Sequence, residues 1–284
     1  MVVAPCRKFN PETVALEGNR MPAEVLRLRG VGVRYDRSML LRDVNWTAHS
    51  DESWVIIGPN GAGKTTLLQV AATLLAPTHG SVEILGQPLA EADIADLRTR
   101  IGMSSSAIAE QVPLHEKVID LVLTASYGIL GRDAEDYDSF DVTRAVELLD
   151  ALGCAHLIRR RFTSLSEGER KRVQIARSLM ADPELLLLDE PAAGLDLGGR
   201  EDLLQRIAGL LRDPRSPMMV MVTHHVEEVP EGFTHAMLMR KGAILASGPL
   251  TEVFTERNLS RCFGVPLQVE RRAARWSARA VPFP

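Results

Sequence analysis

Residues 58–66 combine glycine, lysine and threonine at a spacing that suits the binding of phosphate groups. Glycines allow the backbone to curl tightly enough to direct several N–H groups at one phosphate chain, which larger side chains would block. Residues 54–57 before the loop are an apolar run typical of a buried strand, and residues 65–75 after it have a helical pattern. The segment therefore predicts a phosphate-binding loop at the positive end of a helix. A chance glycine turn is the alternative. The loop reads Gly58, Pro59, Asn60, Gly61, Ala62, Gly63, Lys64, Thr65 and Thr66.

Three polar side chains of this loop are candidates for distinct roles. Lys64 is predicted to reach the β- and γ-phosphates of a nucleotide as a mobile point charge and to act in catalysis. The Thr65 hydroxyl is a candidate ligand of Mg²⁺, because Mg²⁺ prefers an octahedron of oxygen atoms. Thr66 is predicted to bond the α-phosphate. The pattern thus indicates a nucleotide bound with Mg²⁺.

A second candidate element is an acidic pair behind an apolar run. Four consecutive leucines, residues 185–188, precede Asp189 and Glu190. Such a run is typical of a buried parallel strand, and ligands of open α/β sheets bind at the carboxyl ends of strands. Asp189 is a candidate Mg²⁺ ligand, and Glu190 is a candidate base or positioner for attacking water. The alternative is that the pair is only the solvated start of a helix.

Composition restricts the class of protein. With 284 residues, of which 45% are hydrophobic and 25% charged, the chain suits one large globular domain, or a domain with a subdomain. No apolar run approaches the ~20 residues that span a bilayer, and the start lacks the basic and apolar segments of a secretory signal. Three distant cysteines, Cys6, Cys154 and Cys262, show neither disulfide nor metal spacing and indicate a reducing cytoplasm.

Charge gives little sign of nucleic-acid binding. A formal net charge of −4 provides no general attraction to a phosphate backbone. Arginines gather at residues 159–161 and 271–279, and we interpret both as solvated faces, with phosphate or lipid contacts as the alternative.

The order of patterns along the chain predicts the fold class. Residues 25–29, 31–35 and 44–48 read as an antiparallel β layer, with a further strand at 81–85. Residues 113–163 are helical, strand runs return at 185–188 and 218–222, and residues 236–240 and 243–246 read as a closing hairpin. We predict an α/β fold with a parallel-sheet core, an antiparallel β layer and a helical subdomain.

The predicted division of the chain has three parts. Residues 1–22 contain Pro5, Pro11 and Pro22 and are expected to be an extension, with Met21 as an alternative start. Residues 23–264 form the main domain, with the helical subdomain at about 113–180. Residues 265–284 are expected to be a C-terminal tail.

Residues 165–169, Leu-Ser-Glu-Gly-Glu, precede a helix that ends near Asp182. Ser166 and Glu169 have the spacing of a capping box, so helix capping alone is one interpretation. The exposed amides at such a helix start would also bind a second anion. Together with the phosphate loop about 100 residues earlier and the acidic strand that follows, this segment resembles the signature motif of the ATP-binding cassette (ABC) family of P-loop NTPases.

The resemblance covers residues 24–264 and implies further roles. Ser166 and Gly168 would face the γ-phosphate held by a partner subunit, so that two ATP molecules lie in a head-to-tail dimer. Tyr35 would stack on adenine, with packing on the β layer as the alternative. His224 resembles the switch histidine, although His225 lies beside it. Residues 194–196 resemble the loop that connects the two sites. Glu167 and Glu169 stand where the family usually has glycine and glutamine.

A further position departs from the family pattern. After residues 100–103 the family normally has a glutamine that contacts Mg²⁺ and senses the membrane subunit, and here that position falls on Ser106. Serine is too short to span the same gap without water or a moved loop. Gln111 is an alternative with an offset position. We therefore expect coupling to the partner to be weakened or rerouted while ATP binding survives. The variant resembles the branch of molybdate and iron-chelate importer ATPases.

The resemblance implies an ATPase subunit of a transporter, with Glu190, His224 and Lys64 as catalytic residues and Thr65 and Asp189 as metal ligands. An importer of small molecules is favoured because the helical insertion is compact and residues 250–265 resemble the closing segment of importer cassettes. The expected cofactors are ATP and Mg²⁺. The expected partners are a second copy and separate membrane permeases, without direct nucleic acid, at the cytoplasmic face of the membrane. The alternatives are a soluble switch on nucleic acid, the ribosome or a protein, and a phosphoryl-transfer kinase.

Overall fold

The computed structural model describes residues 22–132 and 136–281 of the 284-residue chain. The predicted extension at residues 1–22 therefore lies outside the described residues except for Pro22. Within the described ranges, no helix is long and apolar enough to cross a membrane.

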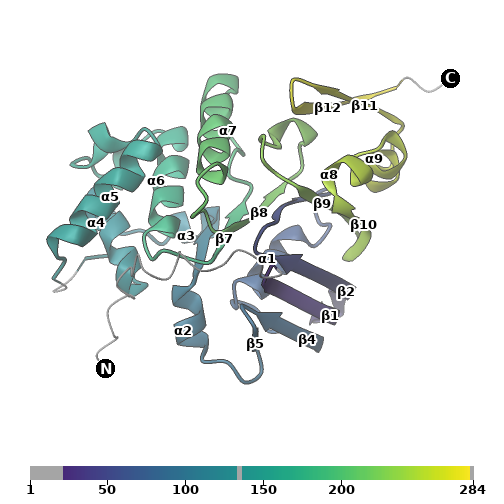
Figure 1. The fold of residues 1–284 in the computed structure, drawn as a ribbon, viewed down its shortest axis with the longest axis horizontal. Helices are drawn as coiled ribbons and strands as arrows, with labels where there is room; N and C mark the ends of the chain where they lie inside the picture. Colours follow the sequence, from purple (N-terminus) through teal and green to yellow (C-terminus); the bar gives the residue numbers. More distant parts are fainter. Residues whose placement is uncertain (1–21, 133–135, 282–284) are drawn as a thin grey trace.

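A six-stranded sheet with the order β10-β9-β3-β8-β7-β6 occupies the centre of the fold (Figure 1). Strands β3, β6, β7, β8 and β9 pair in parallel, and β10 pairs antiparallel with β9. The predicted parallel core and closing hairpin are confirmed. The strands are β3 (Ser53–Ile57), β6 (Ile101–Ser104), β7 (Leu185–Asp189), β8 (Met218–Thr223), β9 (His235–Arg240) and β10 (Ala243–Pro249).

A separate antiparallel sheet has the order β2-β1-β4-β5, as the β layer was predicted to be. It comprises β1 (Glu24–Tyr35), β2 (Ser38–His49), β4 (His79–Ile84) and β5 (Gln87–Pro88). The sequence predicts two short strands divided at Gly30, but β1 is continuous. Gly30 has a φ of 59°, and the pairing with β2 shifts register between Leu28 and Val31. The glycine thus forms an irregularity inside one strand instead of ending it.

Helices cover the central sheet and form a cluster beside it. In Figure 1, α4, α5 and α6 lie together at one side of the molecule, apart from α1. Helix α1 ends at Ala71, earlier than the helix predicted for residues 65–75. The boundary of the helical subdomain at 113–180 remains a prediction. The helices are α1 (Lys64–Ala71), α2 (Ile94–Thr99), α3 (Ser106–Ala109), α4 (Val118–Leu123), α5 (Ser139–Ala151), α6 (Glu167–Leu179), α7 (Leu197–Leu211), α8 (Leu250–Val253) and α9 (Glu256–Phe263).

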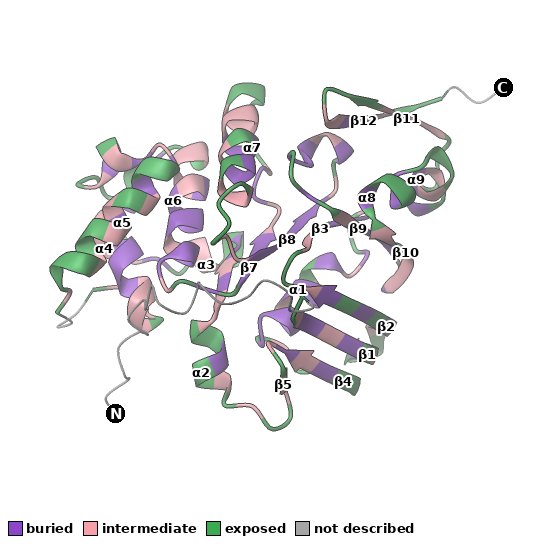
Figure 2. Cartoon of the chain, viewed as in Figure 1, coloured by how far each residue is buried: buried purple, intermediate pink, exposed green. Residues whose placement is uncertain are grey.

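Two apolar cores lie on opposite faces of the central sheet. Leu186 and Leu188 of β7 pack into the core shared with α4–α7, whereas Leu185 and Leu187 pack into the core shared with α1 and the β layer. Successive side chains of a strand point to opposite faces, which is why all four leucines are buried. Figure 2 shows the central strands as buried and the outer helix faces as exposed.

The predicted C-terminal tail contains a hairpin of β11 (Leu267–Arg272) and β12 (Arg275–Ala280). It is attached to the domain through Trp276, which is 8% exposed and contacts Phe254 edge-on at a ring-centroid distance of 5.2 Å. The hairpin turns through Ala273 and Ala274, both at positive φ. Burial of an indole in this way anchors the hairpin on the domain.

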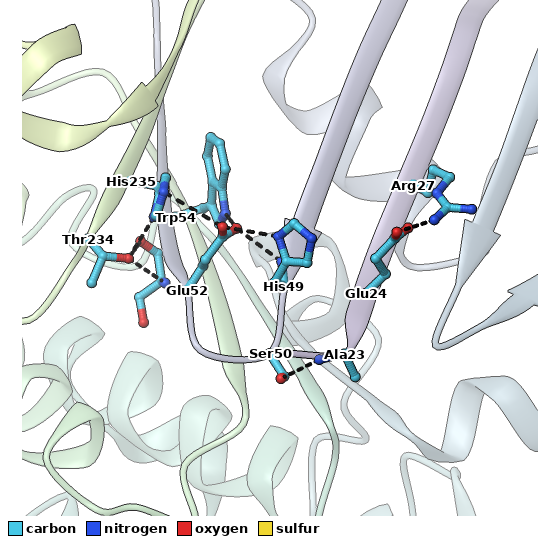
Figure 3. A network of polar contacts seen from close by, with 10 residues as sticks. Ala23, Glu24, Arg27, His49, Ser50, Glu52, Trp54, Thr234 and His235 are labelled. Carbon is cyan, nitrogen blue, oxygen red and sulfur yellow. Dashed lines mark hydrogen bonds and ion pairs between the residues drawn. The ribbon is translucent and has the colours of Figure 1, made fainter. Parts of the chain in front are cut away.

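A polar network joins β2, β3 and β9 at the amino-terminal end of β3 (Figure 3). The Glu52 carboxylate accepts hydrogen bonds from the His49 backbone at 3.0 Å and the Trp54 indole at 2.7 Å. The Nδ1 atom of His49 is 3.1 Å from this carboxylate, and His235, which stacks on Trp54, is 3.6 Å from it. Burial raises the pKa of Glu52, but these hydrogen bonds and the charge of His235 together lower it.

Replacing Glu52 with glutamine should lower the free energy of unfolding at neutral pH by about 1–2 kcal/mol, because bonds to a charged acceptor are lost. The folded-state pKa of Glu52 lies below its ordinary value of 4.5, so the unfolded state binds this proton more tightly. The stabilisation is therefore complete above that ordinary value and is lost as the pH falls through the folded value. Urea unfolding at neutral and acidic pH measures this. The exposed Glu91→Gln is the control, and a difference from wild type that stays constant with pH would contradict the assignment.

Candidate functional site

The carboxyl ends of β3, β8 and β7 meet at one edge of the central sheet. Ile57 of β3 pairs with Thr223 of β8, and Val222 of β8 pairs with Asp189 of β7. Because the strands are parallel neighbours, the residues that follow them emerge side by side. The phosphate loop, Glu190 and His224 are thereby brought to the same place, as the sequence predicts.

The backbone of the phosphate loop requires its glycines. Gly63, at the start of α1, has a φ of 98°, and Gly61 has a φ of 76°. A side-chain carbon at Gly58 would lie 2.2 Å from the carbonyl oxygen of Met239, so β3 and β9 approach too closely there for any other residue. The loop is also tied to the turn between β9 and β10, because the Gly242 backbone N–H donates to the Ala62 carbonyl at 3.0 Å.

Lys64 lies inside this loop with only 5% of its side chain exposed. Its ammonium donates to the carbonyl oxygens of Gly58 at 2.8 Å and Pro59 at 3.2 Å, and lies 3.9 Å from the Glu190 carboxylate. Burial lowers the pKa of Lys64, while the charges of Glu190 and Asp189 raise it and partly compensate. The cation is therefore held at the point where the carboxylates and the loop converge.

Thr65 and Asp189 form a pair of oxygen donors. The Thr65 hydroxyl donates to the Asp189 carboxylate at 3.2 Å. Burial raises the pKa of Asp189, and the bond from Thr65 opposes that shift. Among residues 22–132 and 136–281, no group of three or more His, Cys, Asp or Glu side chains could hold a metal ion by itself. The pair fits a Mg²⁺ ion that takes its remaining ligands from phosphate and water, which is how Mg²⁺ is usually bound.

Glu190 and His224 contact each other. The Nδ1 atom of His224 is 3.2 Å from the Glu190 carboxylate. Glu190 has a φ of 48°, a left-handed conformation that is costly for a residue with a side chain, and its backbone N–H donates to the Val222 carbonyl. His225 is exposed and makes no contact with Glu190 in the described hydrogen bonds and ion pairs, so the geometry favours His224 of the two.

Tyr35 lies at the end of β1 and is 76% exposed. The ring is therefore not part of the apolar core of the β layer, which was the alternative interpretation of this residue. An exposed aromatic face of this kind is suited to stacking on a planar ring.

The start of α6 confirms the predicted capping box. The Ser166 hydroxyl accepts from the Glu169 backbone at 3.3 Å, and the Glu169 carboxylate accepts from the Ser166 backbone at 2.7 Å. In the described part of the chain, no hydrogen bond or ion pair connects Ser166 or Gly168 with the phosphate loop. A side-chain carbon at Gly168 would instead lie 3.7 Å from Leu195. The structure therefore brings together the loop, Asp189, Glu190 and His224, but not Ser166 and Gly168.

Lys171 is a residue that the sequence analysis missed. It lies on α6 with 5% exposure, and its ammonium donates to the Ser106 hydroxyl at 3.3 Å. Its charge also acts on Asp189, where it lowers the pKa. The sequence around Lys171, one turn into α6, does not indicate that its side chain contacts Ser106. Gln111, the offset alternative to Ser106, lies just beyond α3 and donates to the Ala107 carbonyl of that helix at 3.0 Å.

Comparison with known proteins gives one consistent family. Residues 41–193 match the family model described as ABC transporter. An ABC transporter ATP-binding protein of Streptococcus mutans is 38% identical over 86% of this chain and 94% of its own length. A molybdate/tungstate import ATP-binding protein of Thermococcus kodakarensis is 34% identical over 81% of this chain and 67% of its own length.

A solved structure has the same fold over nearly the whole chain. It is a chain from an inward-facing metal-chelate type ABC transporter, with a TM-score of 0.72 and 26% sequence identity. The match covers 92% of this chain and 98% of that one.

Substituting alanine at Gly58 should lower the free energy of unfolding by about 1–3 kcal/mol, because the added carbon overlaps the Met239 carbonyl. It should also weaken binding of a fluorescent ATP analogue, since β3 must move away from β9. Gly61→Ala is the matched control for stability: nothing lies within 4 Å of its added carbon, so the free energy of unfolding falls only by the cost of a left-handed φ, about 1 kcal/mol. Thermal unfolding and analogue titration measure both effects, and equal behaviour of the two variants would contradict the close approach.

Proposed function

This chain belongs to the ABC transporter family of ATP-binding proteins, and from that premise we propose that it hydrolyses ATP in a head-to-tail dimer to drive a small-molecule importer. Proteins of this family are ATPases coupled to transport. The observation that carries the proposal is the convergence of Lys64, Glu190 and His224 at one strand edge. A base, a cation and a histidine are thus assembled around one phosphate position.

We assign phosphate binding to the loop of residues 58–66. Its backbone N–H groups and the start of α1 attract the phosphate chain, and Lys64 exchanges its carbonyl partners for the β- and γ-phosphates. Thr66 bonds the α-phosphate, and Tyr35 stacks on adenine from the end of β1. Thr65 and Asp189 hold Mg²⁺, which neutralises phosphate charge when bound.

Glu190 and His224 are assigned to hydrolysis. Glu190 accepts a proton from the attacking water and orients it toward the γ-phosphorus. His224, within 3.2 Å of Glu190, fixes the position of that carboxylate and contacts the γ-phosphate. The left-handed conformation of Glu190 directs its side chain to this point, which explains why a costly backbone angle is retained.

The dimer is proposed because one chain supplies only one side of the site. The start of α6, with exposed Ser166 and half-buried Gly168, presents the positive end of a helix, and among the described hydrogen bonds and ion pairs it makes none with its own phosphate loop. In a head-to-tail dimer this end covers the γ-phosphate bound by the other copy. Leu197, 67% exposed at the start of α7, is an apolar side chain for such an interface.

An importer is proposed from the comparisons and the chain itself. A relative is named for molybdate/tungstate import, and the similar solved structure is of metal-chelate type. Separate permease subunits are the proposed membrane partners, with this chain at the cytoplasmic face, because the similar solved structure is that of a transporter. Direct binding of nucleic acid is not part of the proposal.

Glu190→Gln should reduce kcat of ATP hydrolysis by about 10²–10⁴-fold, because the general base is lost while the shape remains. Binding of ATP should persist, and the variant should accumulate as an ATP-dependent dimer in size-exclusion chromatography. Ser166→Arg combined with Glu190→Gln should remain a monomer, because the added side chain blocks the partner's phosphate. A Glu190→Gln protein that stays monomeric with saturating ATP would contradict the dimer.

The transporter assignment is tested by what co-purifies with the same Glu190→Gln variant. Captured with ATP from detergent-solubilised cells, it should retain a polytopic membrane protein, whose loss in the Ser166→Arg background would tie capture to the closed dimer. Recovery of ribosomes, nucleic acid or soluble proteins alone would overturn the transporter assignment.

Ser106→Gln should lower the Mg²⁺ concentration that gives half-maximal ATPase activity severalfold, because it restores the glutamine oxygen that contacts Mg²⁺ in the family pattern. It should also displace the Lys171 ammonium from its bond with Ser106. Ala107→Gln, at the next exposed position of α3, is the control. If Ser106→Gln left the ATPase rate and the Mg²⁺ dependence unchanged, the position would have no part in the site.

A further inference from the structure

Arg275, on β12 of the C-terminal hairpin, contacts two different elements of the domain. Its guanidinium donates to both carboxylate oxygens of Glu201, at 2.8 and 3.2 Å, and to the backbone carbonyl of Glu227 at 2.7 Å. A two-pronged bond of this kind fixes direction as well as distance. Arg275 thus fastens the hairpin to Glu201 and Glu227 at once.

Both contacted elements follow residues of the hydrolysis site along the chain: α7 begins seven residues after Glu190, and the 3₁₀ turn η5 (Val226–Glu228) begins two residues after His224. Glu201 lies in the second turn of α7, whose first residue follows Asp196 of the loop at 194–196. Glu227 is the middle residue of η5. A shift of η5 therefore reaches His224 along three residues, and a shift of α7 reaches Glu190 through the loop that precedes the helix.

The hairpin holds η5 by a second contact. The Ala278 backbone N–H donates to the Glu227 carboxylate at 3.0 Å, while Trp276, between Arg275 and Ala278 on the same strand, packs on Phe254. Glu227 is thus held by its main chain and its side chain, and the hairpin that holds it is itself anchored by a buried indole.

η5 depends on such contacts because it is short. A single 3₁₀ turn has poor hydrogen-bond geometry and no ladder of its own. On the side that faces β8, the Thr223 hydroxyl at the end of that strand donates to the Glu228 carboxylate. The His225 backbone N–H donates to the same hydroxyl at 3.1 Å. The segment that carries His224 is therefore held between β8 on one side and the hairpin on the other.

We propose that Arg275 is a positioning residue for ATP hydrolysis: by joining β12 to α7 and η5, it holds His224 at its distance from Glu190. This rests on the proposed function, in which His224 acts at the γ-phosphate. Arg275 touches neither the loop of residues 58–66 nor Glu190 among the described contacts, so it acts only through the segment that it holds.

The test compares kcat and KM for ATP among hairpin variants of the full chain. Arg275→Ala should lower kcat by up to about 100-fold, the effect of a small displacement of a catalytic group, and leave KM for ATP near wild type. Arg275→Lys should give an intermediate kcat, because lysine keeps the charge but loses the two-pronged bond. Glu201→Ala should reproduce much of the loss, and combining it with Arg275→Ala should add little.

Arg272→Ala is the matched control. Arg272 pairs with Arg275 across the same hairpin, but its side chain is 89% exposed and its ion pair with Glu270 spans 3.8 Å. This variant should keep the wild-type kcat. Rates are expressed per ATP-binding site, counted with a fluorescent ATP analogue, so that a partly unfolded preparation does not count as a slow enzyme.

The outcomes separate this inference from the proposed function. Equal kcat per site for Arg275→Ala and Arg272→Ala, with His224→Ala inactive, would overturn the role of Arg275 and leave the function intact. Wild-type hydrolysis by His224→Ala would instead overturn the assignment of His224 itself. A loss in Arg275→Ala that appears as raised KM with unchanged kcat would also overturn the proposal, because the hairpin would then affect ATP binding.

Discussion

The parallel register of β3, β8 and β7 is the constraint on which the other features of the site depend. Pairing of Ile57 with Thr223 and of Val222 with Asp189 places three chain segments, distant in sequence, at one edge. A slip of one residue would turn each strand's side chains to the opposite face and move both cores with them. Burial of both faces therefore fixes the register, and the register fixes the site.

Opposed charges in this small volume stabilise one another. Burial disfavours the ammonium of Lys64 and the carboxylate of Asp189, yet each lies in the field of the other. Bonds to the Gly58 and Pro59 carbonyls satisfy the cation, and Thr65 satisfies Asp189. Residues outside the site also hold the elements that carry these groups. Lys171 on α6 acts from one side and the C-terminal hairpin holds η5 from another, so the supporting contacts reach well past the phosphate and metal ligands.

The local sequence pattern predicts the loop and the strand that carry the site residues, because both have distinctive sequences. The glycine spacing before Lys64 and the leucine run before Asp189 each have few alternatives. The prediction of two strands divided at Gly30 is wrong, because a glycine inside an irregular strand and a glycine between two strands look alike in sequence. The hairpin was predicted only as a tail, because its arginine-rich strands have few apolar residues. Tertiary contacts such as Lys171 with Ser106 leave no periodic trace at all.

The central sheet contributes side chains to both apolar cores, and this arrangement determines the order in which the layers of the fold can unfold locally. Leu185 and Leu187 face one core while Leu186 and Leu188 face the other, so β7 remains packed if either layer separates. If the β layer or the helical cluster detaches, only one face of the sheet is exposed and the other stays covered. Backbone amides of β3, β7 and β8 would then exchange with solvent deuterium only through global unfolding, whereas those of the outer layers exchange through smaller openings. Among the described elements, we therefore expect the strands that carry the phosphate site to open last.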